Sequence, residues 1–510
     1  MHRIADIQRP FIAGERQSNG SQETVSVINP ADERPLAHVA ITSAAQVDEA
    51  VCEAAKAQKQ WVAASPDARA NIIWKWGELI AQHAGELAEL VTLETGKPIN
   101  DSRGEAASSA RIARYWAGMT DKINGTQLPV TPGHLTYTLR EPVGVVAGIM
   151  PWNGPIASFV GRVSSALATG NGVILKPSEF SLLAPLRLSD LTVEAGVPAG
   201  LISTVTGGGD IGALLSSDPG IGAVIFTGGV AGGRRVNQAA AASFKKVTLE
   251  LGGKAPCFVF ADADLDAALQ SVVYGIFGNT GQVCVATSRL LLHRSIADEF
   301  VERLVVVTQR IKVGSPMDES THMGPLISAQ QYESVSRYLG LGTAEARLLT
   351  GGGRPPGLEG KPGFYVAPTV YRDDAGTSTV AREEVFGPVL TVMTFDSEEE
   401  ALRMANDIDL GLSANIWTKD VGTALRIAEG VEAGTIWVNA TRVMDPALPF
   451  GGFKNSGVGN AFGEGAVEGQ TRLRRVTVRH DTRPEQLWSL HSDDLATSST
   501  GAVMGHTDHQ

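Results

Sequence analysis

The spacing of apolar residues divides the chain into a helical first part and an alternating second part. Residues 43–118 are rich in Ala, Gln, Glu, Lys and Arg, and apolar residues such as Ile73, Trp76 and Ile80 recur at helical spacing. From Pro142 onward, short apolar runs alternate with glycine-rich turns and helical segments. The runs are Val143–Ile149, Gly172–Leu175, Leu201–Thr204 and Ala223–Phe226. This alternation predicts an α/β fold, with a parallel sheet that carries helices on its faces.

A second α/β block begins near Gly252. Its pattern predicts strands at Cys257–Phe260, Arg289–His293, Ser413–Trp417 and Thr435–Asn439, and helices at Leu265–Phe277 and Ala297–Ile311. The last stretch, 481–510, mixes Ser, Thr, Asp and His with few apolar residues, so we expect a mobile tail there.

Composition and charge narrow the class of protein. The net charge of -12 argues against binding to nucleic acid or to an anionic membrane, because both would repel the chain. Its first 20 residues carry several charges, which leaves no apolar core for a signal segment. The three cysteines, Cys52, Cys257 and Cys284, are too few and too scattered for a disulfide framework or a zinc site. We therefore expect a soluble, cytoplasmic protein without a bound metal.

Two glycine-rich turns compete as phosphate-binding loops. The run 207–212 fits the spacing GxGxxG after a predicted strand, and the run from Gly228 to Gly233 also follows a strand. Glu250 lies about 20 residues beyond the second turn, the spacing at which an acid binds a ribose. An acid among apolar residues and glycines would also have a raised pKa and could act as a general base. Spacing alone does not choose between these two roles.

Cys284 stands on a loop of small residues, which leaves room for a substrate to approach its sulfur. The alternative for any single cysteine is a buried structural role. That alternative fits Cys52, on a predicted helix, and Cys257, in an apolar run, better than it fits Cys284.

These segments together resemble the aldehyde dehydrogenase superfamily, from Asn29 to about His480. The resemblance rests on separate motifs in the same order: Pro151-Trp152-Asn153, Lys176-Pro177-Ser178-Glu179, Phe226-Thr227-Gly228, Leu249-Glu250-Leu251-Gly252-Gly253-Lys254, Gly281-Gln282-Val283-Cys284, Glu384-Val385-Phe386-Gly387-Pro388 and Pro449-Phe450-Gly451-Gly452. It implies that Cys284 attacks an aldehyde and that Asn153 and the Cys284 N–H hold the oxyanion. It further implies that Glu250 is the base for hydrolysis of the resulting thioester, which settles the choice left open by spacing.

The resemblance also implies the cofactor and its contacts. Lys176 and Glu179 would hold the adenosine ribose, with NAD favoured over NADP because a carboxylate repels a 2′-phosphate. The turn that includes Gly228, Gly229 and Gly233 would receive the pyrophosphate, and the run at Gly207 would be an ordinary turn. The remaining cofactor contacts are expected from Trp152, Glu384 and Phe386.

Domain boundaries follow from the same resemblance. A Rossmann-like NAD-binding domain would comprise 1–122, 142–251 and about 452–470, and a second α/β catalytic domain would comprise 252–451. The segments 123–141 and 471–480 would form a small β oligomerisation arm. Alternating residues in Thr471–Val478 fit such an edge strand, so we expect a homodimer or homotetramer.

Substrate choice is less closely determined. Gly154, Ser158 and Gly161 stand where relatives that act on small aldehydes carry bulky residues, while Val283 and Val285 flank the nucleophile. We expect a roomy, mostly apolar funnel with Phe450 as one wall, suited to aromatic or other bulky aldehydes. No Arg or Lys in these segments is placed to select an anionic substrate.

The chain departs from the family pattern at a few positions. Gly229 stands where many relatives have serine, Asn460 and Ala461 replace a common Arg-Glu pair, and Gln470 replaces a frequent aromatic residue. Two alternatives remain, a CoA-acylating semialdehyde dehydrogenase and a catalytically silent binding member of the family. The presence of both Cys284 and Glu250 argues against each.

Overall fold

A computed structural model describes residues 7–17 and 23–481 of the 510-residue chain. The chain forms two compact units, one of Met1–Ile123 with Glu141–Arg472 and one of Asn124–Arg140 with Leu473–Gln510. Within the described ranges, no helix is both long and apolar enough to cross a membrane. The tail that we expect at 481–510 lies outside these ranges apart from its first residue.

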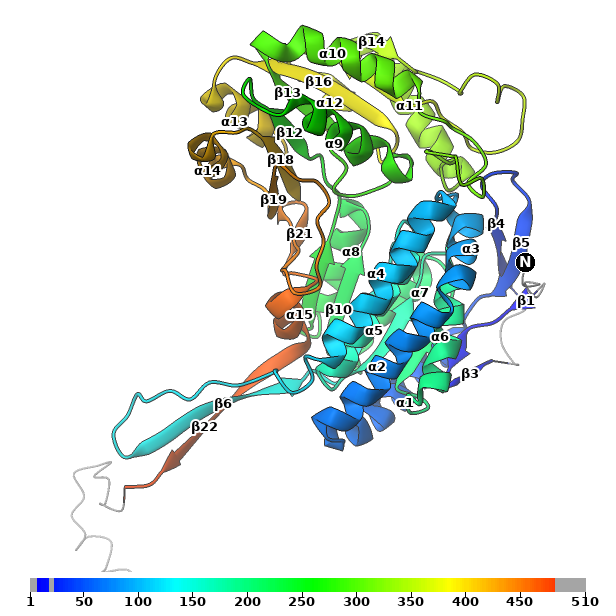
Figure 1. Ribbon diagram of the computed structural model, residues 1–510. Helices are drawn as coiled ribbons and strands as arrows, with labels where there is room; N and C mark the ends of the chain where they lie inside the picture. Colours follow the sequence, from blue (N-terminus) through cyan, green and yellow to red (C-terminus); the bar gives the residue numbers. More distant parts are fainter. Residues whose placement is uncertain (1–6, 18–22, 482–510) are drawn as a thin grey trace, which may run out of the picture. The chain divides into compact units, whose positions relative to one another are not determined.

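The first sheet of the larger unit has eight strands and is parallel at its centre (Figure 1). Strands β2, β3 and β21 at its ends pair antiparallel. In sheet order the strands are β21 (Gly457–Val458), β11 (Lys246–Glu250), β10 (Ala223–Thr227), β7 (Val145–Ile149), β8 (Gly172–Lys176), β9 (Ile202–Thr204), β2 (Phe11–Ile12) and β3 (Glu15–Arg16).

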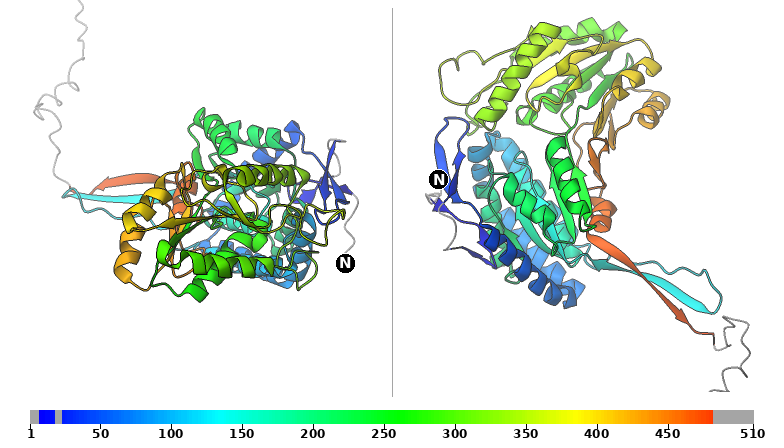
Figure 2. Two further views of the ribbon diagram at one scale, coloured as in Figure 1. Left: turned by 90° about the horizontal axis from the view of Figure 1, so that it is seen from above. Right: turned by 180° about the vertical axis from the view of Figure 1, so that it is seen from behind.

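Helices bury both faces of this sheet (Figures 1 and 2). On one face Val146, Val173 and Leu175 pack with α2, α4, α5 and α6, and on the other Val145 and Ile174 pack with α1, α7 and α8. Burial on both faces explains why these strands are continuous apolar runs. The helices are α1 (Ala44–Ala63), α2 (Pro66–Gln82), α3 (Ala84–Thr95), α4 (Ile99–Ala117), α5 (Pro155–Ala168), α6 (Leu183–Ala195), α7 (Gly209–Ser217) and α8 (Val230–Ala241).

Capping residues set the boundaries of the first helices. Ser43 and Gln46 form a reciprocal capping box at the start of α1, and Ser65 caps α2, which has Pro66 in its first turn. Gly96, in a left-handed conformation, ends α3. The helical character predicted for 43–118 is therefore confirmed and resolves into four helices.

A seven-stranded sheet forms the second half of the unit, parallel except for β14. In sheet order it contains β14 (Arg347–Thr350), β15 (Thr369–Arg372), β16 (Val389–Phe395), β13 (Arg289–His293), β12 (Pro256–Val259), β18 (Ser413–Trp417) and β19 (Thr435–Val438). Its helices are α9 (Leu265–Phe277), α10 (Arg294–Gln309), α11 (Ala329–Glu345), α12 (Thr379–Arg382), α13 (Glu398–Asn406) and α14 (Val421–Gly430), with α15 (Gly463–Gln470) next to the first sheet. The predicted α/β class is thus confirmed, whereas the functions assigned to the segments stay predictions.

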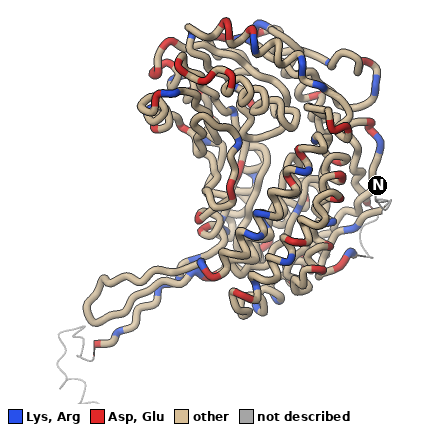
Figure 3. Tube along the Cα trace, in the orientation of Figure 1, with Lys and Arg blue, Asp and Glu red and all other residues tan. Residues whose placement is uncertain are grey.

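Smaller sheets complete the fold. β1 (Ile7–Gln8), β5 (Pro35–Ala40) and β4 (Thr24–Ile28) form one, and β17 (Leu410–Gly411) pairs with β20 (Phe453–Lys454). β6 (His134–Pro142) pairs with β22 (Thr471–Arg479), whose residues are mostly exposed. Along the Cα trace of the larger unit, basic and acidic residues are interspersed (Figure 3).

Candidate active site

Cys284 follows a loop whose backbone is strained and tightly held. After α9 ends, Asn279 and Thr280 have φ angles of 55° and 57°, and Gly281 continues with 70°. A Cβ on Gly281 would lie 2.1 Å from the carbonyl oxygen of Gly387, so only glycine fits there. The hydroxyl of Thr280 donates to the Gly324 carbonyl at 3.1 Å, which ties the loop to a distant segment. The loop therefore presents Cys284 from a fixed backbone.

Cys284 and Asn153 lie where two cavities meet, since both residues line both cavities. Cavity A, of about 520 Å³, lies at the carboxyl ends of β7, β8 and β10. Cavity B, of about 510 Å³, contains Glu250. The thiol of Cys284 can thus face one molecule in each cavity, which is the arrangement that a transfer between two bound molecules requires.

Burial raises the pKa of the Cys284 thiol to about 12, with the charges of Glu384 and Glu250 adding to the rise and Arg442 opposing it. Cys284 is nevertheless partly exposed, whereas Cys257 is buried and Cys52 lies exposed on α1. The thiol is therefore protonated until a ligand or a base changes its surroundings.

Asn153 is held in place by its side-chain amide. Its Nδ2 donates to the carbonyl of Gln282 at 2.9 Å, and Asn279 donates to the same carbonyl at 3.3 Å. One N–H of Asn153 is therefore engaged in positioning, and the amide has a second N–H to offer.

Glu250 ends β11 as a buried carboxyl group that is only 4% exposed. Neither carboxylate oxygen accepts a well-formed hydrogen bond from another described residue. Burial raises the pKa of Glu250 well above its usual range, and the positive charge of Arg162 and the N–H of Ala461 offset part of this rise. Arg162 is itself buried and donates to the Ser158 carbonyl at 2.9 Å and to the Thr227 hydroxyl. A buried carboxyl group with a raised pKa is a candidate for a general base.

Cavity A is bordered by both glycine turns that the sequence offered. Gly208 and Gly209 stand at the start of α7, and Gly228 and Gly229 at the start of α8. The run at Gly207, which the resemblance assigns to an ordinary turn, therefore also borders the cavity. Gly233, which is expected beside the pyrophosphate, is not among the residues that line the cavity. A Cβ there would lie 2.6 Å from the Leu251 side chain, so Gly233 serves the close packing of α8.

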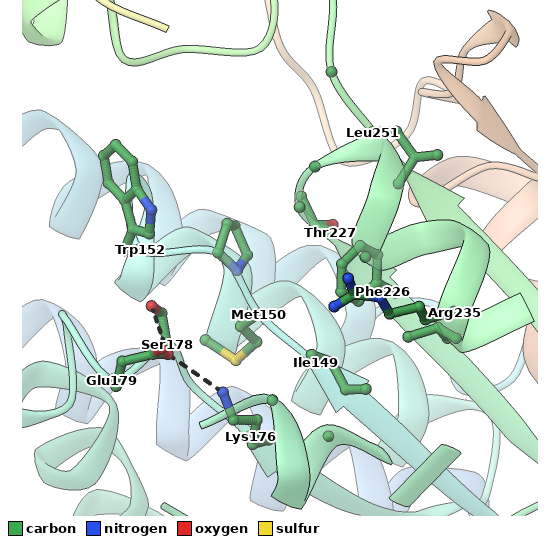
Figure 4. A pocket seen from close by; sticks show the side chains of 18 of the residues that line it. Ile149, Met150, Trp152, Lys176, Ser178, Glu179, Phe226, Thr227, Arg235 and Leu251 are labelled. Carbon is green, nitrogen blue, oxygen red and sulfur yellow. Dashed lines mark hydrogen bonds and ion pairs between the residues drawn. The ribbon is translucent and has the colours of Figure 1, made fainter. Parts of the chain in front are cut away.

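Lys176 and Glu179 lie together at the end of β8, with Nζ and Oε2 3.6 Å apart (Figure 4). Burial lowers the pKa of Lys176, and the charge of Glu179 counters this effect. Phe226 and Arg235 lie across the cavity from this pair in the view of Figure 4. A charged pair beside two helix N-termini can bind both hydroxyl and phosphate groups.

Trp152, Glu384 and Phe386 also line cavity A. The rings of Trp152 and Phe386 meet edge to face, with centroids 5.3 Å apart. Glu384 accepts a hydrogen bond from the Gly253 N–H at 3.0 Å. Burial raises the pKa of Glu384 to about 7 despite the nearby charge of Lys254.

Cavity B brings together every residue that the sequence assigned to the funnel. They are Gly154, Ser158, Gly161, Val283, Val285 and Phe450. Sequence reasoning did not identify Tyr274, Arg442, Met444 or Phe462, which also line it. A Cβ on Gly161 would lie 3.4 Å from the Phe462 ring, so the missing side chain keeps this part of the wall open. Of the positions at which the chain departs from the family pattern, Ala461 lines cavity B and Gly229 lines cavity A.

The two sheets with helices on their faces, and a cysteine that lines two cavities, define an α/β enzyme with room for two ligands. Residues 17–476 match the aldehyde dehydrogenase family, and the chain belongs to that family. Its fold and family, both predicted from the sequence, are thereby confirmed.

Solved structures agree with this assignment. PnpE from Pseudomonas sp. WBC-3 is 39% identical with a TM-score of 0.92, and the match covers 94% of this chain and 99% of that chain. An aldehyde dehydrogenase from Bacillus cereus, solved as an NAD+ complex, is 38% identical, with coverages of 93% and 97% and a TM-score of 0.90. An NAD-dependent aldehyde dehydrogenase from Sinorhizobium meliloti is 38% identical, with coverages of 96% and 97% and a TM-score of 0.92. The cofactor predicted from the sequence agrees with these relatives.

Proposed function

We propose that this protein oxidises an aldehyde to its carboxylic acid, with NAD as the acceptor and Cys284 as the nucleophile. The observation that carries the proposal is that Cys284 and Asn153 line two cavities at once. Cavity B holds the substrate and the base, and cavity A holds the cofactor.

Cavity A fits a dinucleotide. Its two helix N-termini present backbone N–H groups to a pyrophosphate, and a Cβ on Gly229 would meet nothing within 4 Å, which leaves space at the start of α8. Glu179 would accept hydrogen bonds from the adenosine ribose and disfavour a 2′-phosphate, while Lys176 leaves some tolerance for NADP. Glu384 would hold the second ribose, with Trp152 and Phe386 beside it.

The first half of the reaction takes place on Cys284. Its thiolate attacks the aldehyde carbon and forms a thiohemiacetal, and the thiol proton passes to a base. The amide of Asn153 and the backbone N–H of Cys284 stabilise the oxyanion, and fixed donors of this kind contribute roughly 3–4 kcal/mol each to catalysis. When bound, NAD accepts the hydride that leaves the substrate carbon. Cys284 then carries a thioester.

The second half is hydrolysis. Glu250 in its carboxylate form takes a proton from water, which attacks the thioester carbon and releases the acid and the thiol. The raised pKa of Glu250 suits this role, because a higher pKa makes the carboxylate a stronger base toward water. Arg162 helps to keep this buried group ionised.

The shape of cavity B supports aromatic or other bulky aldehydes as substrates. Small residues at 154, 158 and 161 leave the funnel wide, and Val285, Phe450 and Phe462 make much of its wall apolar. We also propose that the protein is cytoplasmic and that β6 and β22 take part in homo-oligomer assembly. Light scattering on the purified protein would test the assembly.

The proposal is tested by following NADH absorbance with a panel of aldehydes. We expect wild type to be active with benzaldehyde and Cys284→Ala to be inactive, while Cys52→Ala, which removes an exposed thiol on α1, keeps full activity. Added CoA should not accelerate turnover, because Glu250 directs the thioester to water. Equal activity of Cys284→Ala and wild type would refute the nucleophile, and acceleration by CoA would indicate the acylating reaction.

A further inference from the structure

The wall of cavity B carries an arginine, Arg442, that neither the funnel pattern nor the proposed chemistry uses. It lies on the loop after β19, and its backbone is left-handed, with a φ of 52°. A non-glycine residue in this region stores strain, which persists only where neighbouring contacts hold the residue in place.

Two kinds of contact fix the guanidinium of Arg442. Its Nη2 donates to the carbonyl of Gly275 at 2.9 Å and, more weakly, to that of Gly278 at 3.4 Å. Its Cζ also lies 5.0 Å from the centre of the Tyr274 ring, over its face. Because α9 ends here, the cation sits at the negative end of that helix. The side chain is therefore directed and held, although the loop itself is irregular.

The charge of Arg442 is not neutralised by a direct partner. Among the described residues no carboxylate forms a salt bridge with it, and Asp101 attracts it only over a longer distance. The other cations of cavity B differ in this respect. Lys97 is paired with Glu105 and Arg111 with Asp445, and Arg162 has Glu250 as its counter-charge.

Arg442 lines the same cavity as Cys284 and Glu250. Its positive charge also offsets part of the rise in the pKa of the thiol. Its Nε is enclosed and makes no hydrogen bond with any described residue. Removing charge from water without a partner is costly, so a held guanidinium beside a substrate cavity favours an anionic ligand.

We propose that Arg442 is a specificity-determining residue, and that the preferred substrates of this enzyme are aldehydes carrying a carboxylate. The inference rests on the proposed function and names the substrate class more narrowly. The carboxylate binds the guanidinium while the aldehyde reaches Cys284, and the wide apolar walls hold the ring or chain between them. The acidic Asp101 opposes this binding and would favour a cationic substrate instead, so the test includes one.

The experiment compares three aldehydes of similar size, namely 4-formylbenzoate, its methyl ester and 4-(trimethylammonio)benzaldehyde. For wild type we expect kcat/KM to be roughly 10- to 100-fold higher for 4-formylbenzoate than for the ester, the range that a charge-assisted hydrogen bond supplies. The cationic aldehyde should be the poorest of the three. A wild-type preference for the ester or for the cation would overturn the proposal without any variant.

Variants then assign the preference to Arg442. Arg442→Met should bring the acid and ester within about two-fold of each other, and Arg442→Lys should restore part of the difference. Arg310→Met, which removes an exposed arginine after α10, is the matched control and should keep the wild-type ratio. An equal loss of activity toward acid and ester in Arg442→Met would indicate a structural role in capping α9 and would refute the proposal.

Failure of the proposed function is distinguishable. If no aldehyde is oxidised, calorimetric binding of 4-formylbenzoate and its ester to wild type and to Arg442→Lys still decides whether the arginine selects the anion. Tighter binding of the acid, weakened by the lysine, would support the inference, and equal binding of both ligands would reject it.

Discussion

Adding one methyl group at Gly252 should move Glu384 and weaken cofactor binding. A Cβ at this position would lie 2.0 Å from Oε2 and 3.2 Å from Oε1 of Glu384, and the three atoms nearest to it all belong to that side chain. Since the φ of Gly252 is outside the left-handed region, alanine causes no backbone strain there. The carboxylate must therefore withdraw by about 1.4 Å to reach ordinary contact distance.

This displacement has a calculable consequence. The carboxylate loses the hydrogen bond from Gly253, 3.0 Å long, and its position toward the cofactor ribose. A hydrogen bond to a charged group contributes about 1.5–3 kcal/mol, so we expect the KM for NAD to rise roughly 10- to 100-fold. The KM for the aldehyde should change little, because Glu384 lines cavity A and not cavity B.

The assay is initial-rate NADH formation with NAD varied at saturating aldehyde. Gly340→Ala is the matched control, since it also adds one methyl group but meets nothing within 4 Å in α11. It should keep the wild-type KM and raise the melting temperature slightly. If the folded Gly252→Ala variant bound NAD as well as wild type does, Glu384 would not hold the cofactor. If only the KM for the aldehyde rose, Glu384 would instead take part in substrate binding.

Two further changes test the base and the phosphate turn. In Arg162→Met, loss of the positive charge should raise the pKa of Glu250 further. The acidic limb of the pH profile of kcat should therefore move to higher pH, and the rate at neutral pH should fall roughly ten-fold. The reasoning is contradicted if the limb does not move, or if Arg162→Lys does not restore its wild-type position. Gly229→Ser adds a hydroxyl at the uncapped start of α8, where the backbone is extended and a Cβ has free space. We expect about 0.3 kcal/mol of added stability in thermal melts and a lower KM for NAD, and a higher KM would show that the space is needed by the cofactor.

Much of the fold could be predicted because its strands follow simple patterns. Arg289–His293 and Ser413–Trp417 have the predicted boundaries as β13 and β18, since apolar runs buried on both faces end where the sheet ends. Motifs in order also predicted that Asn153 and Glu250 lie around one cavity with Cys284, although Asn153 is far from Cys284 in the chain. A glycine that permits helix packing and one that faces a phosphate look the same in sequence, so the contact expected of Gly233 with the cofactor stays a prediction.

Residues of cavity B that have no motif could not be found in this way. Tyr274 lies on α9 and Phe462 lies just before α15, and only tertiary packing brings them to one cavity. Arg442 was missed for the same reason, because it stands outside the segments from which the funnel was predicted. Its guanidinium donates to the backbone carbonyl of Gly275 in α9. Because every residue type has a backbone carbonyl, the sequence does not reveal this contact.

Backbone strain gives a physical reason why local sequence rules fail around the nucleophile. Asn279, Phe386 and Arg442 all line a cavity that contains Cys284, and each has a positive φ. Holding a non-glycine residue at a positive φ costs of order 1–3 kcal/mol, so the intrinsic preference of these residues would favour another conformation. The strain is held by contacts from elsewhere, as Gln331 donates to the Phe386 carbonyl at 2.8 Å. The two cavities therefore keep their shape through long-range contacts, and the segments least predictable from local pattern are those that position the reacting groups.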